Sequence, residues 1–125
     1  MWTYEQRTGR LTSPAGDVVA TGYSGAGDGK NDPAAQAEHN VGPIPAGTYT
    51  IGPPKDTLTH GPFVLPLSPS ADNEMFGRAG FLIHGDSVTE PGTASEGCVI
   101  MPRAVRELVA ASDDKTLSVV GDIAD

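Results

Sequence analysis

The stretch IHGDSVTEPGTASEGCVIMP, residues 83–102, contains one of the three histidines of the chain and its only cysteine. His84 closes an apolar segment, AGFLIHG, and Cys98 opens a second one, CVIM, and both segments are predicted strands. The fourteen positions from His84 to Cys98 are mostly Gly, Pro, Ser, Thr and acidic residues, which is typical of a loop. A loop of this length can return the chain to the neighbouring strand. The spacing therefore predicts an imidazole and a thiol within hydrogen-bond reach of each other.

Cys98 has two interpretations on these residues alone. A lone free cysteine most often fills space in a core, and a lone histidine is also more often structural than reactive. Gly97 favours a reactive thiol, because a glycine directly before a nucleophile lets the backbone turn tightly and lets a substrate carbonyl approach. In that interpretation the backbone amides of Gly97 and Cys98 form an oxyanion hole, and His84 is the base that activates the thiol.

The charges around the thiol add a constraint. Asp86 and Glu96 are close in sequence to Cys98, and negative neighbours raise a thiol pKa. His84 is the only group of this stretch that can be positive, so a reactive Cys98 depends on an ion pair or on proton transfer with it. The second nitrogen of the imidazole needs a partner as well. Asp86 and the backbone carbonyl of Gly85 are both candidates, and the sequence leaves the two open.

The whole chain predicts one mostly-β domain over residues 1–125. Its sixteen Gly and eleven Pro are too many for a helical bundle and indicate short strands with many turns. Alternating large and polar residues in WTYEQ, with further short segments separated by turns, are typical of a β-sandwich or a half-open barrel. One helix is predicted at about residues 102–112, because Val105, Leu108 and Val109 recur at helical spacing.

Two segments are less regular. Residues 25–43 begin Gly-rich and then offer Asp32 as a helix N-cap before Pro33, so either a short helix over residues 33–38 or a long surface loop is expected. The strand FVLPL contains Pro66. Because proline donates no ladder hydrogen bond, an edge position in the sheet is predicted for this strand.

Composition excludes several classes of partner. The net charge of −8 argues against nucleic-acid binding through general electrostatics. No apolar run approaches about eighteen residues, so no membrane partner is expected. One cysteine and three scattered histidines show no metal-ligand spacing, and we expect neither a metal nor a cofactor. The opening MWTYEQRTGR lacks the basic and apolar regions of a secretory signal, which predicts synthesis in the cytoplasm and export by separate machinery.

These motifs resemble a known family. IHG followed by SEGCVI is similar to the signature of L,D-transpeptidases with a YkuD-like domain, and GPIPAGTYTI resembles the segment in which a turn of that family leads into a core strand. Over nearly its whole length the chain looks closest to the L,D-transpeptidase-like antibacterial effectors of type VI secretion (Tlde-type). The resemblance implies a β-sandwich-like catalytic domain with Cys98 as the acyl-forming nucleophile and His84 as its base. It also implies an oxyanion hole of backbone amides near Gly97 and Cys98.

The resemblance also implies a reaction and a setting. Cys98 attacks the carbonyl of the third residue of a peptidoglycan stem tetrapeptide, the terminal D-alanine leaves, and a thioester forms. Water then gives L,D-carboxypeptidase activity, and an amine gives exchange or cross-linking. Such an effector acts in the periplasm of a target bacterium and has a cognate immunity protein as partner. Two other interpretations are a housekeeping cell-wall L,D-transpeptidase and a catalytically silent cell-wall or secretion-associated binding module.

Contacts to the substrate are expected from residues around the motif. The carboxylates of such a substrate need cationic partners in an acidic protein, and Arg78 is the first choice, ahead of Arg103 and Lys30. Ser95 is an ordinary turn serine, a hydrogen-bond partner of the loop that holds Cys98, or a contact to the substrate. If residues 25–43 form a lid over the cleft, three more side chains lie near the substrate. These are Tyr23, Ser24 and His39.

Overall fold

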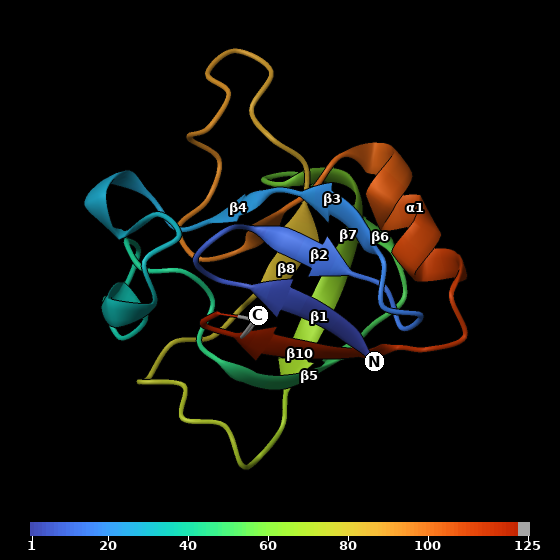
Figure 1. Cartoon of the computed structure of the whole chain (residues 1–125). Coiled ribbons are helices and arrows are strands. Elements are labelled where there is room, and N and C mark those ends of the chain that lie inside the picture. Colours follow the sequence, from blue (N-terminus) through green and yellow to red (C-terminus); the bar gives the residue numbers. More distant parts are fainter. Residues whose placement is uncertain (123–125) are drawn as a thin grey trace.

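The computed structural model describes residues 1–122, whose strands form one strongly bent sheet with helix α1 packed outside it (Figure 1). The strands are β1 (Trp2–Glu5), β2 (Arg10–Thr12), β3 (Val18–Thr21), β4 (Tyr23–Ser24), β5 (Gly47–Ile51), β6 (Lys55–Thr57), β7 (Gly61–Pro69), β8 (Leu82–His84), β9 (Val99–Ile100) and β10 (Thr116–Val120). The helical elements are the 3-10 turns η1 (Gly27–Gly29) and η2 (Pro33–Ala35) and the α-helix α1 (Arg103–Ala111). The prediction of a mostly-β fold with one helix near residues 102–112 is confirmed.

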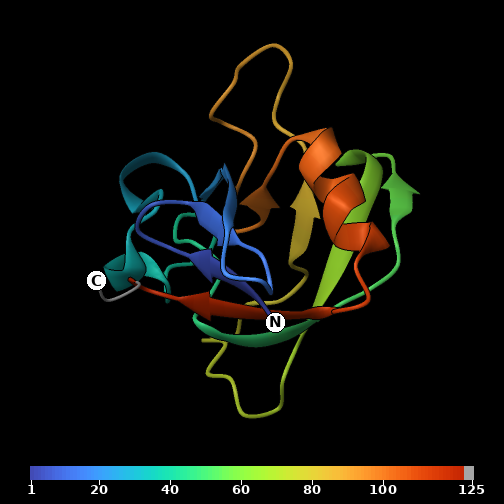
Figure 2. The same cartoon turned by 45° about the vertical axis from the view of Figure 1, so that its right-hand side comes forward.

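The sheet curls until its two ends meet at Gly22. The strand order is β3-β2-β1-β10-β5-β7-β8-β9-β4, and β6 pairs with β7. β3 and β4 stand at opposite ends of this order, yet only Gly22 separates them in the sequence, so the chain crosses there between the two halves of the sheet (Figure 2). Gly22 N–H donates to the Gly9 carbonyl at 2.8 Å, and a Cβ at Gly22 would lie 1.8 Å from the carbonyl oxygen of Ile100. Only glycine fits this corner.

β7 is the strand that links the two halves. Its end pairs with β5, where Leu67 stands opposite Ile51, its middle pairs with β8, and its start pairs with β6. The predicted edge position of FVLPL is therefore wrong, because β7 has partners on both sides. Pro66 is tolerated since β5 ends at Ile51 and β6 begins only at Lys55. The missing N–H of the proline falls in the gap between these two partners, where it removes no ladder hydrogen bond.

Both halves of the sheet contribute to one apolar core. Fully buried side chains from the two halves include Tyr4, Tyr49, Leu65, Ile83 and Leu117. Helix α1 packs against β7 and β8, with Val109 buried and Val105 partly buried. Leu108, expected on the same apolar face, is 50% exposed, and Arg106 is buried instead. Around the helix Leu108 lies about 60° from Val105 and about 100° from Val109, on the side of the stripe opposite Arg106. No helix within residues 1–122 is long and apolar enough to cross a membrane.

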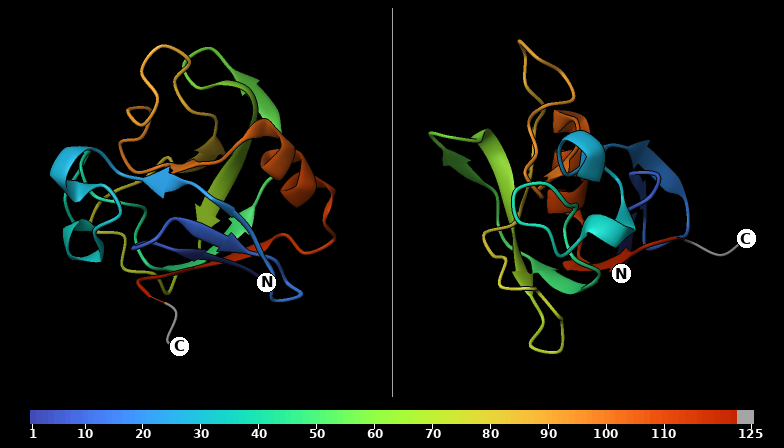
Figure 3. Two further views of the ribbon diagram at one scale, coloured as in Figure 1. Left: turned by 45° about the horizontal axis from the view of Figure 1, so that its top comes forward. Right: turned by 90° about the vertical axis from the view of Figure 1, so that its left-hand side faces the viewer.

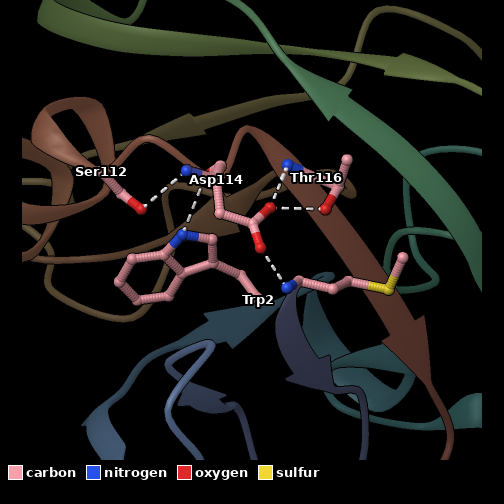
Figure 4. A network of polar contacts seen from close by, with 5 residues as sticks. Trp2, Ser112, Asp114 and Thr116 are labelled. Carbon is pink, nitrogen blue, oxygen red and sulfur yellow. Dashed lines mark hydrogen bonds and ion pairs between the residues drawn. The ribbon is translucent and has the colours of Figure 1, made fainter.

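Asp114 connects the turn after α1 to the N-terminal strand through hydrogen bonds (Figure 4). Its carbonyl oxygen accepts a hydrogen bond from Trp2 Nε1 at 3.2 Å. Its carboxylate accepts from the N–H (3.0 Å) and the hydroxyl (2.6 Å) of Thr116, and from the Met1 amino group. Trp2 is buried and stands opposite Leu117 in the parallel pair of β1 and β10. These contacts fix the register of the two strands at the centre of the sheet.

Residues 25–43 form a loop with two 3-10 turns. Asp32 is the N-cap of η2, as expected, and its carboxylate accepts from the Ala34 N–H at 3.0 Å. The helical segment stops after Ala35, so the longer helix considered for residues 33–38 is absent. The segment is closed on itself by a backbone hydrogen bond from Ala26 N–H to the Val41 carbonyl at 2.9 Å.

Candidate active site

The site lies where β8 ends and β9 begins, on two neighbouring parallel strands. The register pairs Ile83 with Val99 and His84 with Ile100. Side chains alternate between the two faces of a strand. Cys98 directly precedes Val99 and stands two positions before Ile100, so it falls on the same face of the pair as His84. The strands thus carry the thiol and the imidazole to one side of the sheet.

A cleft of about 420 Å³ opens over this face. One of its walls is the loop 85–97, and another is the turn between β6 and β7, and both project from the same end of the molecule (Figure 3). Residues that line the cleft include His84, Cys98, Asn40, His60, Phe81 and Glu96. The thiol and the imidazole therefore border one cavity that is open to solvent.

His84 is buried, and its ring is held by the backbone. Nδ1 lies 2.8 Å from the carbonyl oxygen of Gly85, so Nδ1 carries the proton and Nε2 is left as an acceptor. Burial lowers the pKa of His84, and repulsion from His60 and Arg106 lowers it further. The Gly85 carbonyl and Asp86 act in the opposite direction. At neutral pH the imidazole is therefore uncharged, which is the form that can accept a proton.

The carboxylate of Asp86 makes its contacts away from the imidazole. It accepts hydrogen bonds from the Tyr23 hydroxyl at 2.5 Å, the Ser87 N–H at 2.8 Å and the Gly92 N–H at 3.1 Å. These contacts fasten the loop between β8 and β9 to β4. Of the two groups expected to orient the histidine, the carbonyl of Gly85 makes the contact and Asp86 organises the loop.

Cys98 is half-buried in the cleft and is uncharged at rest. Burial raises the pKa of the Cys98 thiol, and Glu96 raises it further. The Leu82 N–H and the positive charge of Arg78 lower it in part. In the part of the chain that the structure describes, no hydrogen bond joins the thiol to His84. The hydrogen bond predicted between thiol and imidazole is therefore not formed in the free protein, which holds both groups uncharged at one cleft and without an ion pair.

Gly97 forms the turn that presents the cysteine. Its φ of +142° lies in a region that favours glycine, and a Cβ there would stand 2.5 Å from Nη2 of Arg78 and 2.9 Å from the ring of Phe81. The Gly97 N–H donates to Ser95 Oγ at 3.0 Å. One of the two amides expected in the oxyanion hole is thus already engaged. Among residues 1–122 the Cys98 amide has no such partner.

Two buried serines support this turn from the side away from the cleft. Ser95 Oγ donates to the Cys98 carbonyl at 2.6 Å and accepts from the Gly25 N–H at 2.9 Å. Ser24 Oγ donates to the Gly97 carbonyl at 2.8 Å. Because both side chains are buried within this network, they shape the turn before Cys98, and neither is exposed to a substrate.

The sequence that builds this cleft matches a protein family. A family model, described as the Tlde1 domain, matches residues 18–121. The chain belongs to the Tlde1 domain family. These are L,D-transpeptidase-like domains of type VI secretion effectors, so the predicted Tlde-type relationship is confirmed, while the wider resemblance to YkuD-like enzymes stays a prediction. No curated protein and no solved structure matches the chain.

Arg78 is buried in this Tlde1 domain and is engaged with the backbone. Nη1 donates to the carbonyls of Gln36 at 2.6 Å and Pro43 at 2.7 Å. Nη2 donates to the carbonyls of Gly42 at 2.9 Å and Glu96 at 3.2 Å. Both terminal nitrogens of the guanidinium are thus committed, and the side chain does not present the free fork expected for a substrate carboxylate. Arg78 instead connects the loop 25–43 to the turn before Cys98.

The other cations considered for the substrate also have partners in the Tlde1 domain. Lys30 Nζ donates to the Gly92 carbonyl at 2.5 Å and lies 4.7 Å from the centre of the Tyr23 ring. Arg103 is exposed and pairs with Glu107 at 3.6 Å. None of these residues lines the cleft of Cys98. Tyr23 and Lys30 therefore act together on the loop 85–97.

His39 and Asn40 are the residues of the loop 25–43 that line a hollow at the site. Asn40 lines the cleft, whereas His39 lines a smaller hollow of about 120 Å³ beside it. His39 Nε2 is 2.8 Å from the carbonyl oxygen of Phe76. The expected contact of His39 with a substrate, and the lid function of its loop, stay predictions.

His60 is the cleft residue that the sequence did not reveal. The centre of its ring lies 4.7 Å from that of His84, with the two planes inclined at 51°. It occurs in an ordinary turn, LTHGP, and no motif connects it with the cysteine. Only the pairing of β6 with β7 and of β7 with β8 brings it to the site. Within residues 1–122, no group of three or more His, Cys, Asp or Glu side chains is placed to hold a metal ion.

Proposed function

We propose that this Tlde1 domain is a cysteine acyltransferase that removes or exchanges the terminal D-alanine of peptidoglycan stem tetrapeptides. The observation that carries the proposal is the state of His84. Its Nδ1 is engaged by the carbonyl of Gly85 at 2.8 Å, so Nε2 is available as a base in the cleft that Cys98 shares. Family membership supports this chemistry, because Tlde1 domains are L,D-transpeptidase-like.

Acylation begins when the Cys98 thiol gives its proton to Nε2 of His84. The sulfur attacks the carbonyl carbon of the third stem residue, and the electron pair of the C=O double bond moves onto oxygen. The Cys98 amide stabilises that oxyanion in this proposal, since the Gly97 amide is bonded to Ser95. The C–N bond then breaks, the imidazolium protonates the leaving nitrogen, and D-alanine departs from a thioester.

A second nucleophile then opens the thioester. Nε2 of His84 takes a proton from water or from an acceptor amine, which attacks the thioester carbonyl. The C–S bond breaks and the proton passes to the Cys98 sulfur. Water leaves a tripeptide, and a D-amino acid leaves an exchanged tetrapeptide. Both half-reactions start with an uncharged imidazole, which agrees with the lowered pKa of His84 that burial produces.

The biological setting of the proposal follows from the family. A type VI effector is delivered into a competing bacterium, where this reaction consumes tetrapeptides in the periplasm. The producing cell then needs a cognate immunity protein that binds the domain.

The proposal is tested by incubating the protein with a disaccharide-tetrapeptide, with and without added D-methionine, and following the products by mass spectrometry. We expect loss of D-alanine or its exchange for D-methionine. Cys98→Ala and His84→Ala should show neither product while keeping the circular dichroism spectrum of the wild type. Intact tetrapeptide after incubation of the wild type at several pH values would contradict the proposal.

The effector role has its own test. The chain is expressed in a susceptible bacterium with and without an added periplasmic signal sequence. Growth arrest or lysis is expected only for the exported form and only with Cys98 present. Equal growth of cells with the exported wild type and with exported Cys98→Ala would exclude an antibacterial activity that depends on this thiol.

A further inference from the structure

The imidazole of His60 is held in a defined place at the rim of the cleft. In the turn between β6 and β7, the His60 N–H donates to Thr57 Oγ1 at 2.8 Å. The ring is anchored through Nδ1, which lies 3.0 Å from Thr59 Oγ1. Arg106 Nη1 donates to the carbonyls of Pro62 (3.1 Å) and Phe63 (2.9 Å), so helix α1 fastens the base of this hairpin. Nε2 of His60 is the ring atom left for a ligand.

The cleft continues past His84 on the side away from Cys98. This second lobe, which we call the His60 lobe, has a volume of about 420 Å³. Its lining includes His60, His84, Thr59, Asp86, Ser87 and Thr93, and Cys98 is not part of it. His60 and His84 border both lobes, so the two imidazoles stand at the junction between them.

The chemistry of acyl transfer assigns different parts of the substrate to the two lobes. The carbonyl carbon that is attacked must lie at the Cys98 sulfur. The nitrogen that leaves must lie at His84, because the same imidazole delivers its proton. The residue attached to that nitrogen therefore extends past His84 into the His60 lobe, and so does the amine or water that later replaces it.

The His60 lobe needs a positive charge if the leaving residue ends in a carboxylate. Asp86, from the loop 85–97, lines the His60 lobe with a carboxylate. No Lys or Arg is among the described residues that line this lobe. Arg106, from α1, contacts the hairpin backbone at Pro62 and Phe63. His84 is buried, which disfavours a charge on its ring, whereas His60 is exposed.

We propose that the imidazolium of His60 binds the terminal carboxylate of the leaving residue through Nε2, which restricts the enzyme to the last peptide bond of a stem peptide. The inference rests on the function proposed above. Thr59 fixes the other ring nitrogen, so the donor points from a defined position. The same contact favours an amino acid, which also carries a carboxylate, over a simple amine as the acceptor that enters in exchange.

Binding is the decisive measurement, because it does not require turnover. Cys98→Ala protein is titrated calorimetrically at about pH 6 with disaccharide-tetrapeptide and with the same compound as its C-terminal carboxamide, since histidine changes charge in this range. We expect the carboxylate to bind roughly tenfold more tightly than the amide, which is typical of one charged hydrogen bond. His60→Gln in the same background should abolish this preference, and His60→Lys should restore part of it.

Leu58→Gln is the matched control, because Leu58 is fully exposed in the same turn and lines neither lobe. It should keep the preference for the carboxylate. Equal affinity of Cys98→Ala protein for the two compounds, lack of binding to either, or a preference that survives His60→Gln would each overturn the role of His60.

Turnover by the wild type separates this inference from the proposed function. If the wild type releases D-alanine but the carboxylate preference does not depend on His60, the inference fails and the proposed function stands. If the preference depends on His60 but the wild type releases no D-alanine, the carboxylate site stands and the proposed reaction fails. In an active enzyme, His60→Gln should raise KM for the tetrapeptide roughly tenfold with a smaller change in kcat.

Discussion

Nδ1 of His84 and the carbonyl oxygen of Gly85 lie 2.8 Å apart, so the backbone of the next residue orients the imidazole. The partner of the imidazole is thus a main-chain oxygen. The carboxylate of Asp86 instead accepts hydrogen bonds from Tyr23 and from the backbone of its own loop. The site therefore has the two side chains of a Cys–His pair with a main-chain third member. This arrangement separates the orientation of the base from the acidic residues of the loop.

Asp86→Asn tests this arrangement. The substituted amide oxygen still accepts from Tyr23 and Gly92, and the imidazole keeps its contact with Gly85, so kcat for D-alanine release should fall by less than about tenfold. A carboxylate that orients the catalytic histidine contributes about 10⁴ in kcat where it has been removed from a triad. A loss of that size, with unchanged stability to urea, would make Asp86 the orienting group.

The ionisation of His84 is a second test. Burial lowers the pKa of His84, and His60 and Arg106 lower it further, so the ring loses its proton at a lower pH than the ordinary histidine value of 6.5. In a proton NMR titration we expect a midpoint for His84 below 6.5. His60→Gln removes one of the repulsive charges and should move the midpoint upward, while Leu58→Gln should leave it in place. A midpoint above 6.5 in the wild type would contradict the buried, neutral imidazole.

The parts of this site that the sequence predicts are those carried by local patterns. The placement of Cys98 and His84 on neighbouring strands, the helix at its expected place and the mostly-β fold follow from strand patterns, turn residues and the spacing of one motif. The hydrogen bond predicted between thiol and imidazole is not formed within residues 1–122. The position of Pro66 misled the prediction for β7, because the sequence does not indicate that β5 ends where β6 has yet to begin.

Three features of the site depend on tertiary contacts that the sequence does not reveal. Arg78 is expected to meet a substrate because the substrate carboxylates need a cationic partner in an acidic protein, but the fold buries it against four backbone carbonyls. His60 approaches His84 only through strand pairings that join distant segments. The choice between Asp86 and the Gly85 carbonyl depends on a loop conformation that Tyr23 imposes from β4.

Alkylation of Cys98 provides a third prediction. Burial and Glu96 raise the pKa of the thiol, so the free protein contains little thiolate near pH 7, and its reaction with iodoacetamide should be slower than that of an exposed thiol. The rate of alkylation should continue to increase with pH beyond the ordinary thiol pKa of 9.0.

Glu96→Gln removes a repulsive charge, lowers the pKa of the Cys98 thiol and should raise the rate of alkylation at pH 8 by roughly two- to threefold. Glu90→Gln, in the same loop, is the control without that effect. Rapid alkylation at pH 6 would indicate a resting thiolate.

Arg78→Met should destabilise the fold. The substitution leaves buried backbone carbonyls of residues 36–43 and of Glu96 without their donor, at a cost of about 3 kcal/mol in the free energy of unfolding. Urea unfolding followed by circular dichroism measures this loss. Arg103→Met, which removes an exposed guanidinium, should change stability by less than about 0.5 kcal/mol. Unchanged stability of Arg78→Met with a raised KM would instead return Arg78 to the role of a substrate contact.

Tyr23→Phe tests how the loop 85–97 is held over the cleft. The Tyr23 hydroxyl donates to Asp86 at 2.5 Å and accepts from the Ala94 N–H at 3.0 Å, so its loss should lower stability by about 1 kcal/mol and reduce kcat/KM severalfold.

Burial and the bond to Asp86 raise the pKa of Tyr23 to about 12. A tyrosine with a raised folded pKa stabilises the fold fully below its ordinary value of 10, and this contribution is lost as the pH rises toward about 12. Urea unfolding at about pH 9 to 12 should therefore show a difference in the free energy of unfolding between wild type and Tyr23→Phe that shrinks with increasing pH. A constant difference, or none, would mean that the hydroxyl does not fasten the loop.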